Sequence, residues 1–221
     1  MTLLPPSGQP ILYVTEGSGN SFKPALALHQ LGKSCDLRFV DVLAGQTRQP
    51  AFLAVNKAGQ VPYYLDEEGV GFAQSNAMLW RIADGTSLMP DTAGGRATAL
   101  QWMFFEQTRL EPNISPARFY TAIVPHRAAE FAADIPRWQA GAVAGLALLD
   151  EHLASSRFIV KRYGYSIGDI GVFGYVHMAE QAGVDLGPFR AVRKWIARVQ
   201  ATPRFASVGD LLTPSALRRA G

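Results

Sequence analysis

Residues 56–73 read NKAGQVPYYLDEEGVGFA, and this stretch predicts a β-hairpin that opens on a proline. An apolar run over residues 61–65 is followed by an acidic turn at 66–69 and by a short strand over 70–73. A strand, a tight turn and a second strand form an antiparallel hairpin. Pro62 removes a ladder donor, so it belongs at a strand start. From the residues alone, its preceding peptide bond is either trans, the commoner form, or cis.

The residues around this hairpin predict a small α/β domain. The apolar run ILYV at residues 11–14 is a buried strand. Further elements are a helix over 24–31 with Pro24 in its first turn, a strand over 37–42, a helix over 50–55 and a helix from Ser75 onward. The order is βαβαββα, and the first two strands are parallel because a crossover helix joins them.

The sequence pattern changes from mixed strands and helices to helices after a Gly- and Pro-containing linker at residues 85–95. Beyond it the patterns predict helices over 97–109, 128–131, 138–153, 167–181 and 192–199, with an ambiguous strand-like run at 158–160. The predicted organisation is therefore a domain over residues 1–84, the linker 85–95, and an all-α domain over residues 96–221.

Composition excludes several classes of protein. The 221 residues are 48% hydrophobic and 18% charged, which is a globular mixture and not that of a disordered chain. The lack of a long apolar run and of a secretory signal favours a cytoplasmic protein away from membranes. A net charge of +3 does not indicate a nucleic-acid partner. The only cysteine, Cys35, is either structural or a nucleophile that needs a nearby base.

Two helix starts carry polar groups suited to an anion. Gly17-Ser18-Gly19-Asn20 lies between the first strand and its helix and is either a ligand loop or an ordinary turn. Gln74-Ser75 heads another helix, where Ser75 is a candidate N-cap. Its alternative role is to receive a ligand carboxylate together with the helix N–H groups.

Other patterns exclude chemistry or predict structure. The four histidines form no metal-binding spacing, and no GxSxG elbow is present, so we expect neither a metal centre nor a serine hydrolase. Ser166 and Asp169 have capping-box spacing, with Tyr165 and Ile170 placed as a hydrophobic staple. The helix that they start is apolar nearly all round, which predicts a central position.

Together these motifs resemble a cytosolic glutathione transferase, in the style of bacterial members with serine or asparagine in the first loop. The resemblance rests on five segments, which occur in the order LYVTEGSGNSFK, NKAGQVPYYLD, AQSNAMLWRIAD, YGYSIGDIGVFGYVHMAE and FRAVRKWIARVQATPRF. The resemblance implies a thioredoxin-like domain that holds glutathione and an all-α domain that supplies the second-substrate pocket. It also implies a homodimer.

The resemblance assigns roles to individual residues. Ser18 falls where serine-type members keep a hydroxyl facing the glutathione sulfur, and Asn20 is the runner-up contact. Gly19 stands where some relatives have a catalytic cysteine, whereas Tyr13 lies inside the strand, away from the tyrosine-type position. The implied glutathione contacts are Val61, a cis Pro62, Gln74 and Ser75, with Gln60 and Lys57 near the glycyl end. Arg109, Phe119 and Tyr120 lie where members line the acceptor pocket, core packing being the alternative for each aromatic.

The implied activity is transfer of glutathione to a small electrophile, as in detoxification. A free thiol, with a pKa near ~8.5, is mostly protonated at neutral pH, and a donated hydrogen bond stabilises its thiolate. Two alternatives remain: a glutathione-dependent disulfide reductase, and a transferase-like binding or regulatory protein without catalysis.

Overall fold

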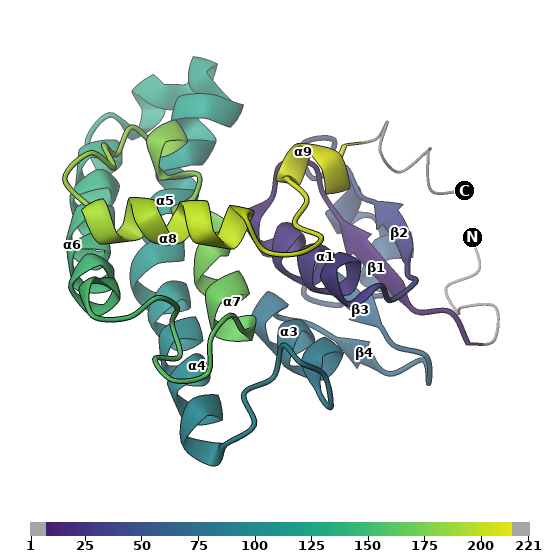
Figure 1. Ribbon diagram of the computed structural model, residues 1–221. Coiled ribbons are helices and arrows are strands. Elements are labelled where there is room, and N and C mark those ends of the chain that lie inside the picture. Colours follow the sequence, from purple (N-terminus) through teal and green to yellow (C-terminus); the bar gives the residue numbers. More distant parts are fainter. Residues whose placement is uncertain (1–7, 214–221) are drawn as a thin grey trace. The chain divides into compact units, whose positions relative to one another are not determined.

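The computed structural model describes residues 8–213. These residues form two compact units: one comprises residues 8–86 together with 203–213, and the other comprises residues 87–202. Figure 1 labels their helices and strands. Among the described helices, none combines the length and the apolar character needed to cross a membrane.

The first unit contains a four-stranded sheet in the order β2-β1-β3-β4. Its strands are β1 (Ile11–Val14), β2 (Asp36–Phe39), β3 (Tyr63–Leu65) and β4 (Gly71–Phe72). Strand β1 pairs parallel with β2 and antiparallel with β3, which forms the predicted hairpin with β4. With α1 (Gly19–Leu31), α2 (Pro50–Leu53) and α3 (Ser75–Ala83), the order confirms βαβαββα and a thioredoxin-like domain.

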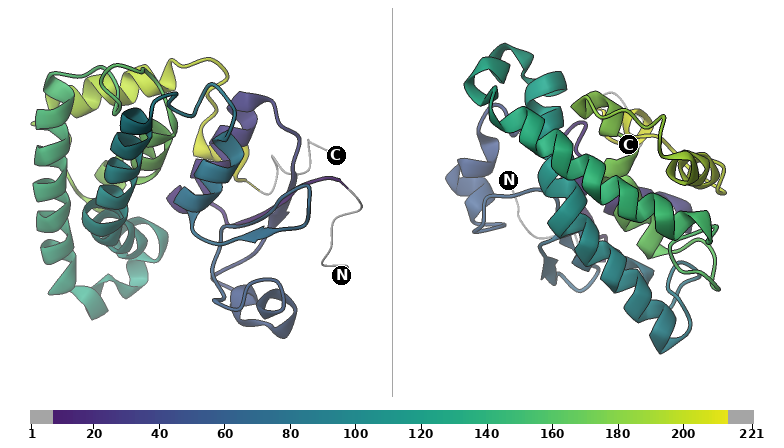
Figure 2. Two further views of the ribbon diagram at one scale, coloured as in Figure 1. Left: turned by 90° about the horizontal axis from the view of Figure 1, so that it is seen from below. Right: turned by 90° about the vertical axis from the view of Figure 1, so that its left-hand side faces the viewer.

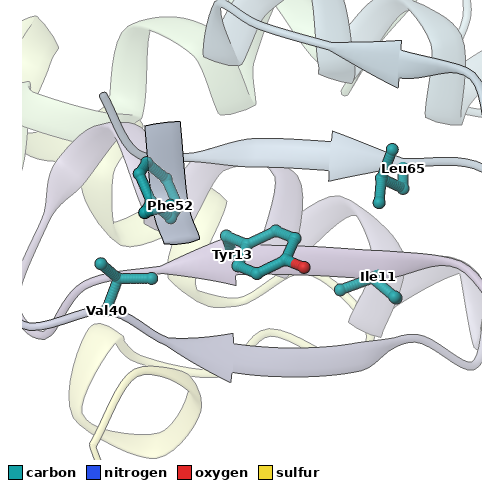
Figure 3. Packing of buried hydrophobic residues seen from close by; sticks show 5 residues of the cluster. All are labelled: Ile11, Tyr13, Val40, Phe52 and Leu65. Atoms are coloured by element: carbon teal, nitrogen blue, oxygen red, sulfur yellow. The ribbon is translucent and has the colours of Figure 1, made fainter. Parts of the chain in front are cut away.

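Strand β1 is buried on both faces of this sheet. Ile11 and Tyr13 point to one face, where they join Val40, Phe52 of α2 and Leu65 in a hydrophobic cluster (Figure 3). The Tyr13 and Phe52 rings meet edge to face at 5.8 Å between centroids. Helices α1 and α3 run side by side on the opposite face (Figure 2, left). The sheet therefore fixes where both helices start.

Several element boundaries differ from the sequence prediction. Helix α1 begins at Gly19 and not near Pro24, because Ser18 caps it and Phe22, which precedes Pro24, is already buried. Pro24 therefore lies inside the helix, where it removes one backbone hydrogen bond. The prediction of Ser75 as an N-cap is also wrong, since Gln74 occupies that position and Ser75 is the first helical residue.

The second unit is helical, as predicted. Its helices are α4 (Ala93–Phe105), α5 (Glu111–Arg118), α6 (Asp134–Ala154), α7 (Ile167–Val176) and α8 (Arg190–Gln200), with π-helical turns at Glu106–Leu110 and Phe119–Ile123 and 3₁₀ turns at Pro125–Phe131 and Ala179–Ala182. The predicted helix over 167–181 thus ends at Val176, and residues 128–131 are 3₁₀. Short elements of the first unit are a 3₁₀ turn (Gln46–Arg48) and α9 (Val208–Leu211), which packs on α1.

Helix α7 is the centre of the second unit, because all ten of its residues are buried. The predicted capping box is present between Ser166 and Asp169. The Asp169 carboxylate is fully buried and accepts hydrogen bonds from Ile159 N at 2.9 Å, Ser166 N at 3.0 Å and Trp195 Nε1 at 2.8 Å. Burial raises its pKa from 3.8 to about 7, and these hydrogen bonds oppose the rise. Asp169 therefore joins α7, α8 and the preceding loop.

We expect Asp169→Ala to destabilise the protein strongly. The substitution leaves three buried donors unsatisfied, at about 1–3 kcal/mol each, so the free energy of unfolding should fall by roughly 3 kcal/mol or more. Urea unfolding followed by circular dichroism measures the change.

The control is Asp210→Ala, which removes the corresponding member of the exposed Ser207–Asp210 capping box. Because water can satisfy the exposed donors, a loss of about 1 kcal/mol or less is expected there. Equal losses in the two variants would contradict the structural role given to the buried carboxylate.

Candidate functional site

The loop between β1 and α1 is held by the side chain of Ser21. Ser21 Oγ accepts a hydrogen bond from Thr15 N at 3.3 Å, and Ser21 N donates to Ser18 Oγ at 3.1 Å. Ser18 is thereby the N-cap of α1, and its oxygen has a defined direction. Ser18 Oγ accepts this bond through a lone pair. Its O–H group can therefore donate a hydrogen bond to an anion.

Asn20 connects the start of α1 to the start of α3. Its Oδ1 atom accepts hydrogen bonds from Lys23 Nζ at 3.0 Å and from Ser75 Oγ at 3.0 Å. Asn20 is the second residue of α1, and Ser75 is the first residue of α3. Two helix N-termini, each with a partial positive charge, therefore lie close together. That arrangement suits an anionic ligand.

The proline-led start of β3 lies at the same end of the sheet. In the antiparallel β1–β3 pair, Ile11 is opposite Leu65 and Tyr13 is opposite Tyr63. The end of β1 that leads to Ser18 is therefore the end at which β3 begins. The Val61–Pro62 bond is cis, as the resemblance implied.

The loop before Val61 is shaped by a buried side chain that sequence reasoning did not single out. Asn56 Nδ2 donates to Gln60 O at 2.8 Å, and Asn56 Oδ1 accepts from Ala58 N at 3.1 Å. The Asn-Lys-Ala sequence was the available signal, since asparagine commonly forms such local turns. Lys57 and Gln60 are exposed on this loop, and no interaction joins their side chains to Ser18 or Asn20 among the hydrogen bonds described above.

Gln74 has a strained backbone at the start of α3. Its φ of 70° and ψ of 113° lie in a region that residues other than glycine rarely adopt. Its side chain is exposed and makes no capping hydrogen bond to the helix. Strain of this kind costs of order 1–3 kcal/mol and concentrates at ligand-binding positions. The side chain of Gln74 therefore lies beside Ser75 and does not cap the helix.

Neither Tyr13 nor Cys35 is suited to activate or supply a thiolate here. The Tyr13 hydroxyl accepts from Arg38 Nη1 at 3.3 Å, and its ring belongs to the cluster of Figure 3. Burial, with smaller effects from the charges of Asp36 and Glu67, raises the pKa of Cys35 from 9.0 to about 12. Such a thiol is protonated at neutral pH and is a poor nucleophile.

The three acceptor-pocket candidates lie on the π-helical turns of the second unit. Arg109 is on the first turn, and Phe119 and Tyr120 begin the second. Ten residues separate Arg109 from Phe119, which is about 15 Å of rise along a helix. Tyr120 stacks on Phe131 at 3.8 Å between ring centroids, and Phe119 meets Tyr120 edge to face.

The π-helical turn at Glu106–Leu110 has an identifiable local cause. Pro112, in the first turn of α5, lacks an N–H and crowds the preceding helical turn. Asn113 Nδ2 donates to Arg109 O at 2.8 Å and satisfies a carbonyl at the irregular turn. Turns of this type are frequent at functional sites, and the three candidate residues lie on them. Across residues 8–213, no cluster of three or more His, Cys, Asp or Glu suits a metal.

Comparison with known proteins places the chain in a family. No family model matches it. A possible glutathione S-transferase from Rhodopseudomonas palustris is 41% identical, with a TM-score of 0.88, and the match covers 93% of this chain and 91% of that one. A glutathione S-transferase from Pseudomonas fluorescens is 33% identical, with a TM-score of 0.85 and coverage of 90% and 98%. This chain belongs to the glutathione S-transferase family.

Curated relatives of this transferase-family chain differ in activity. Glutathione S-transferase 3 of Zea mays is 34% identical over 119 residues, which are 52% of this chain and 53% of the maize protein. The chain thus aligns with about half of that relative. Disulfide-bond oxidoreductase YfcG of Escherichia coli is 26% identical over 191 residues, covering 83% of this chain and 87% of YfcG. Transcriptional regulator URE2 of Saccharomyces cerevisiae is 27% identical over 115 residues, 48% of this chain and 32% of URE2.

More distant solved structures share the fold. Ure2p in complex with glutathione is 21% identical with a TM-score of 0.81 and covers 94% of this chain and 100% of that one. The glutathione transferase URE2P6 from Phanerochaete chrysosporium, in complex with oxidised glutathione, is 22% identical with a TM-score of 0.80 and coverage of 97% and 98%. At these identities the similarity concerns the fold alone.

We expect Cys35 to resist alkylation in the folded protein. At about pH 8, a pKa of 9.0 leaves about a tenth of a thiol ionised, whereas a pKa of about 12 leaves roughly one part in ten thousand. Mass spectrometry after iodoacetamide treatment should therefore show modification at least a hundredfold slower than in urea-unfolded protein. Rapid modification of the native chain would show that Cys35 is a reactive thiolate.

Proposed function

We propose that this protein is a glutathione transferase in which Ser18 and Asn20 stabilise the glutathione thiolate for attack on a small electrophile. The observation that carries the proposal is the hydrogen bond between Asn20 and Ser75, which brings the starts of α1 and α3 together. The cis Val61–Pro62 bond lies at the same sheet end. Support also comes from family membership and from relatives crystallised with glutathione.

The tripeptide would be held by groups of the first unit. The γ-glutamyl carboxylate would bind at the start of α3, with Gln74 beside it. Because the Ser75 hydroxyl donates to Asn20, the first backbone N–H groups of α3 would supply the main contacts to this carboxylate. The backbone of Val61, positioned by the cis Pro62, would pair with the cysteinyl part. Gln60 and Lys57 would approach the glycyl end from the exposed loop.

The chemistry requires a donor at the sulfur and no protein nucleophile. A hydrogen bond to a charged group contributes about 1.5–3 kcal/mol, which lowers a thiol pKa by roughly one to two units. The thiol proton passes to water, the thiolate sulfur forms a bond to the electrophilic carbon, and the leaving group departs with its electron pair. Ser18 donates a hydrogen bond throughout and forms no covalent bond.

A second candidate function is glutathione-dependent disulfide reduction. The alignment with the oxidoreductase YfcG covers 87% of that protein, which favours this reading. Since Cys35 is protonated, the exchange would run between glutathione thiolate and the substrate disulfide. A non-catalytic role is supported only by URE2 matches such as the one covering 32% of the yeast regulator.

For either enzyme we propose a cytoplasmic homodimer of bacterial type, with Arg109, Phe119 and Tyr120 contributing to the second-substrate pocket.

The proposal is tested by glutathione calorimetry and by two assays on wild type and Ser18→Ala. We expect wild type to bind glutathione and to conjugate chlorodinitrobenzene faster than it reduces hydroxyethyl disulfide. Ser18→Ala should lower kcat/KM for conjugation about 10- to 100-fold near neutral pH, because the thiol pKa rises by one to two units. The loss should shrink at alkaline pH, where the thiolate forms without help.

The control separates activation from helix capping. Ser18→Ala also removes an N-cap, at a cost of about 1 kcal/mol. Thr92 is the N-cap of α4, and its Oγ accepts a hydrogen bond from Gly95 N at 3.0 Å. Thr92→Ala should therefore reduce stability by a similar amount while leaving the pKa of the bound thiol unchanged. No glutathione binding by wild type would refute the proposed function. Unchanged conjugation by Ser18→Ala would contradict the role of Ser18 and leave Asn20 or a backbone amide as the donor to the sulfur.

Gln74→Gly should separate stability from ligand binding. Glycine adopts a positive φ without strain, so the free energy of unfolding should rise by about 1 kcal/mol despite the entropy cost of glycine. Glutathione affinity should fall about tenfold, since one hydrogen bond to a charged group is lost. Thermal unfolding and calorimetry measure the two effects. A stabilised variant with full affinity would remove Gln74 from the site.

A further inference from the structure

Lys23 is a fully buried lysine on α1, next to the candidate glutathione site. Its side chain has 0% solvent exposure. Lysine is almost never buried completely without a polar partner, because removing an ammonium from water is costly. Here Lys23 Nζ lies 3.0 Å from Asn20 Oδ1. The buried ammonium is thereby joined to a residue of the candidate site.

The ammonium determines which way the Asn20 amide faces. An ammonium only donates hydrogen bonds, so the Asn20 atom beside it is the carbonyl oxygen and not the NH₂ group. The Ser75 hydroxyl approaches the same oxygen and must also donate. Two donors on one carbonyl oxygen fix the amide plane. The amide nitrogen then points away from Lys23, and it is the only group of the Asn20 side chain that donates to an anion.

We propose that Lys23 is a positioning residue for thiolate activation, because it holds the Asn20 amide with its N–H group directed to the glutathione sulfur. This inference rests on the proposed function. An ammonium bonded to the amide oxygen also polarises the amide and strengthens its N–H as a donor. Lys23 thus acts through Asn20 and does not itself touch the substrate.

The test is a double-mutant cycle of Lys23→Met and Asn20→Ala, read by the pKa of bound glutathione. Methionine keeps an unbranched, apolar side chain and removes the ammonium. Thiolate absorbance in the ultraviolet, titrated against pH, reports the thiol pKa directly. We expect each single variant to raise that pKa by about one unit and to lower kcat/KM about tenfold at pH 6.5. The double variant should resemble Asn20→Ala, since both act through one donor.

The matched control is Lys33→Met, which also removes an ammonium from the first unit. Lys33 Nζ donates to Ile82 O at 2.8 Å and has no hydrogen bond to Asn20 or Ser75 among those described. Its loss should leave the bound-thiol pKa within about 0.2 units of wild type, whereas any general effect of net charge would shift both variants alike. Near pH 9, Lys23→Met should approach wild-type activity, which a merely misfolded variant would not do.

The variant Asn20→Asp tests the same proposal without depending on the stability of a lysine variant. Aspartate still accepts from Lys23 and Ser75 but has no N–H donor, so the bound-thiol pKa should rise at least as much as in Asn20→Ala. If Lys23→Met does not fold, Lys23→Gln replaces it in the cycle. A low thiol pKa in Asn20→Asp, or additive effects in the cycle, would overturn the role of Lys23 while wild type still activates glutathione. An unshifted thiol pKa in wild type would instead overturn the proposed function.

Discussion

The carbonyl oxygen of Asn20 is shared by two helices of the first unit, and the candidate site depends on it. Lys23 donates to it from the same helix, and Ser75 donates to it from the start of α3. The central strand β1 and the cluster around Tyr13 support the sheet beneath these helices. Without this shared acceptor, a lysine ammonium and a serine hydroxyl would be buried without these bonds, and the two helix N-termini would lose their connection.

Much of the fold could be predicted from the sequence because its elements are local. The run at residues 11–14 is short, apolar and followed by a turn cluster, the hairpin is marked by its acidic turn, and the Ser166–Asp169 spacing specifies its own cap. The start of α1 was predicted incorrectly because Gly19 and Pro24 both disfavour helix interiors. The Ser18 cap and the burial of Phe22 and Leu26 outweigh those penalties.

The site was predictable residue by residue but not as a set of contacts. Ser18 and Asn20 stand in a recognisable loop, yet the bond from Asn20 to Ser75 joins positions 55 residues apart. Ser75 donates to Asn20 and does not cap α3, and this role of its hydroxyl follows only from the tertiary structure. Lys23 gave no signal, because a lysine three residues after an asparagine normally lies on a solvated helix face. The π-helical turn at Glu106–Leu110 likewise depends on how the helix accommodates Pro112.

Two structural costs in the first unit lie where α1 and α3 begin. Gln74 holds a strained backbone there, and Lys23 holds a buried charge, whereas the sheet cluster of Figure 3 is apolar and edge-to-face packed. A sequence selected for stability alone would place glycine at position 74 and an apolar side chain at position 23. Lys23 donates to the Asn20 amide oxygen, and Gln74 directly precedes Ser75, which donates to the same oxygen. The same physical demand explains them: an anion needs N–H donors fixed in advance, and fixing them requires structure that is otherwise unfavourable.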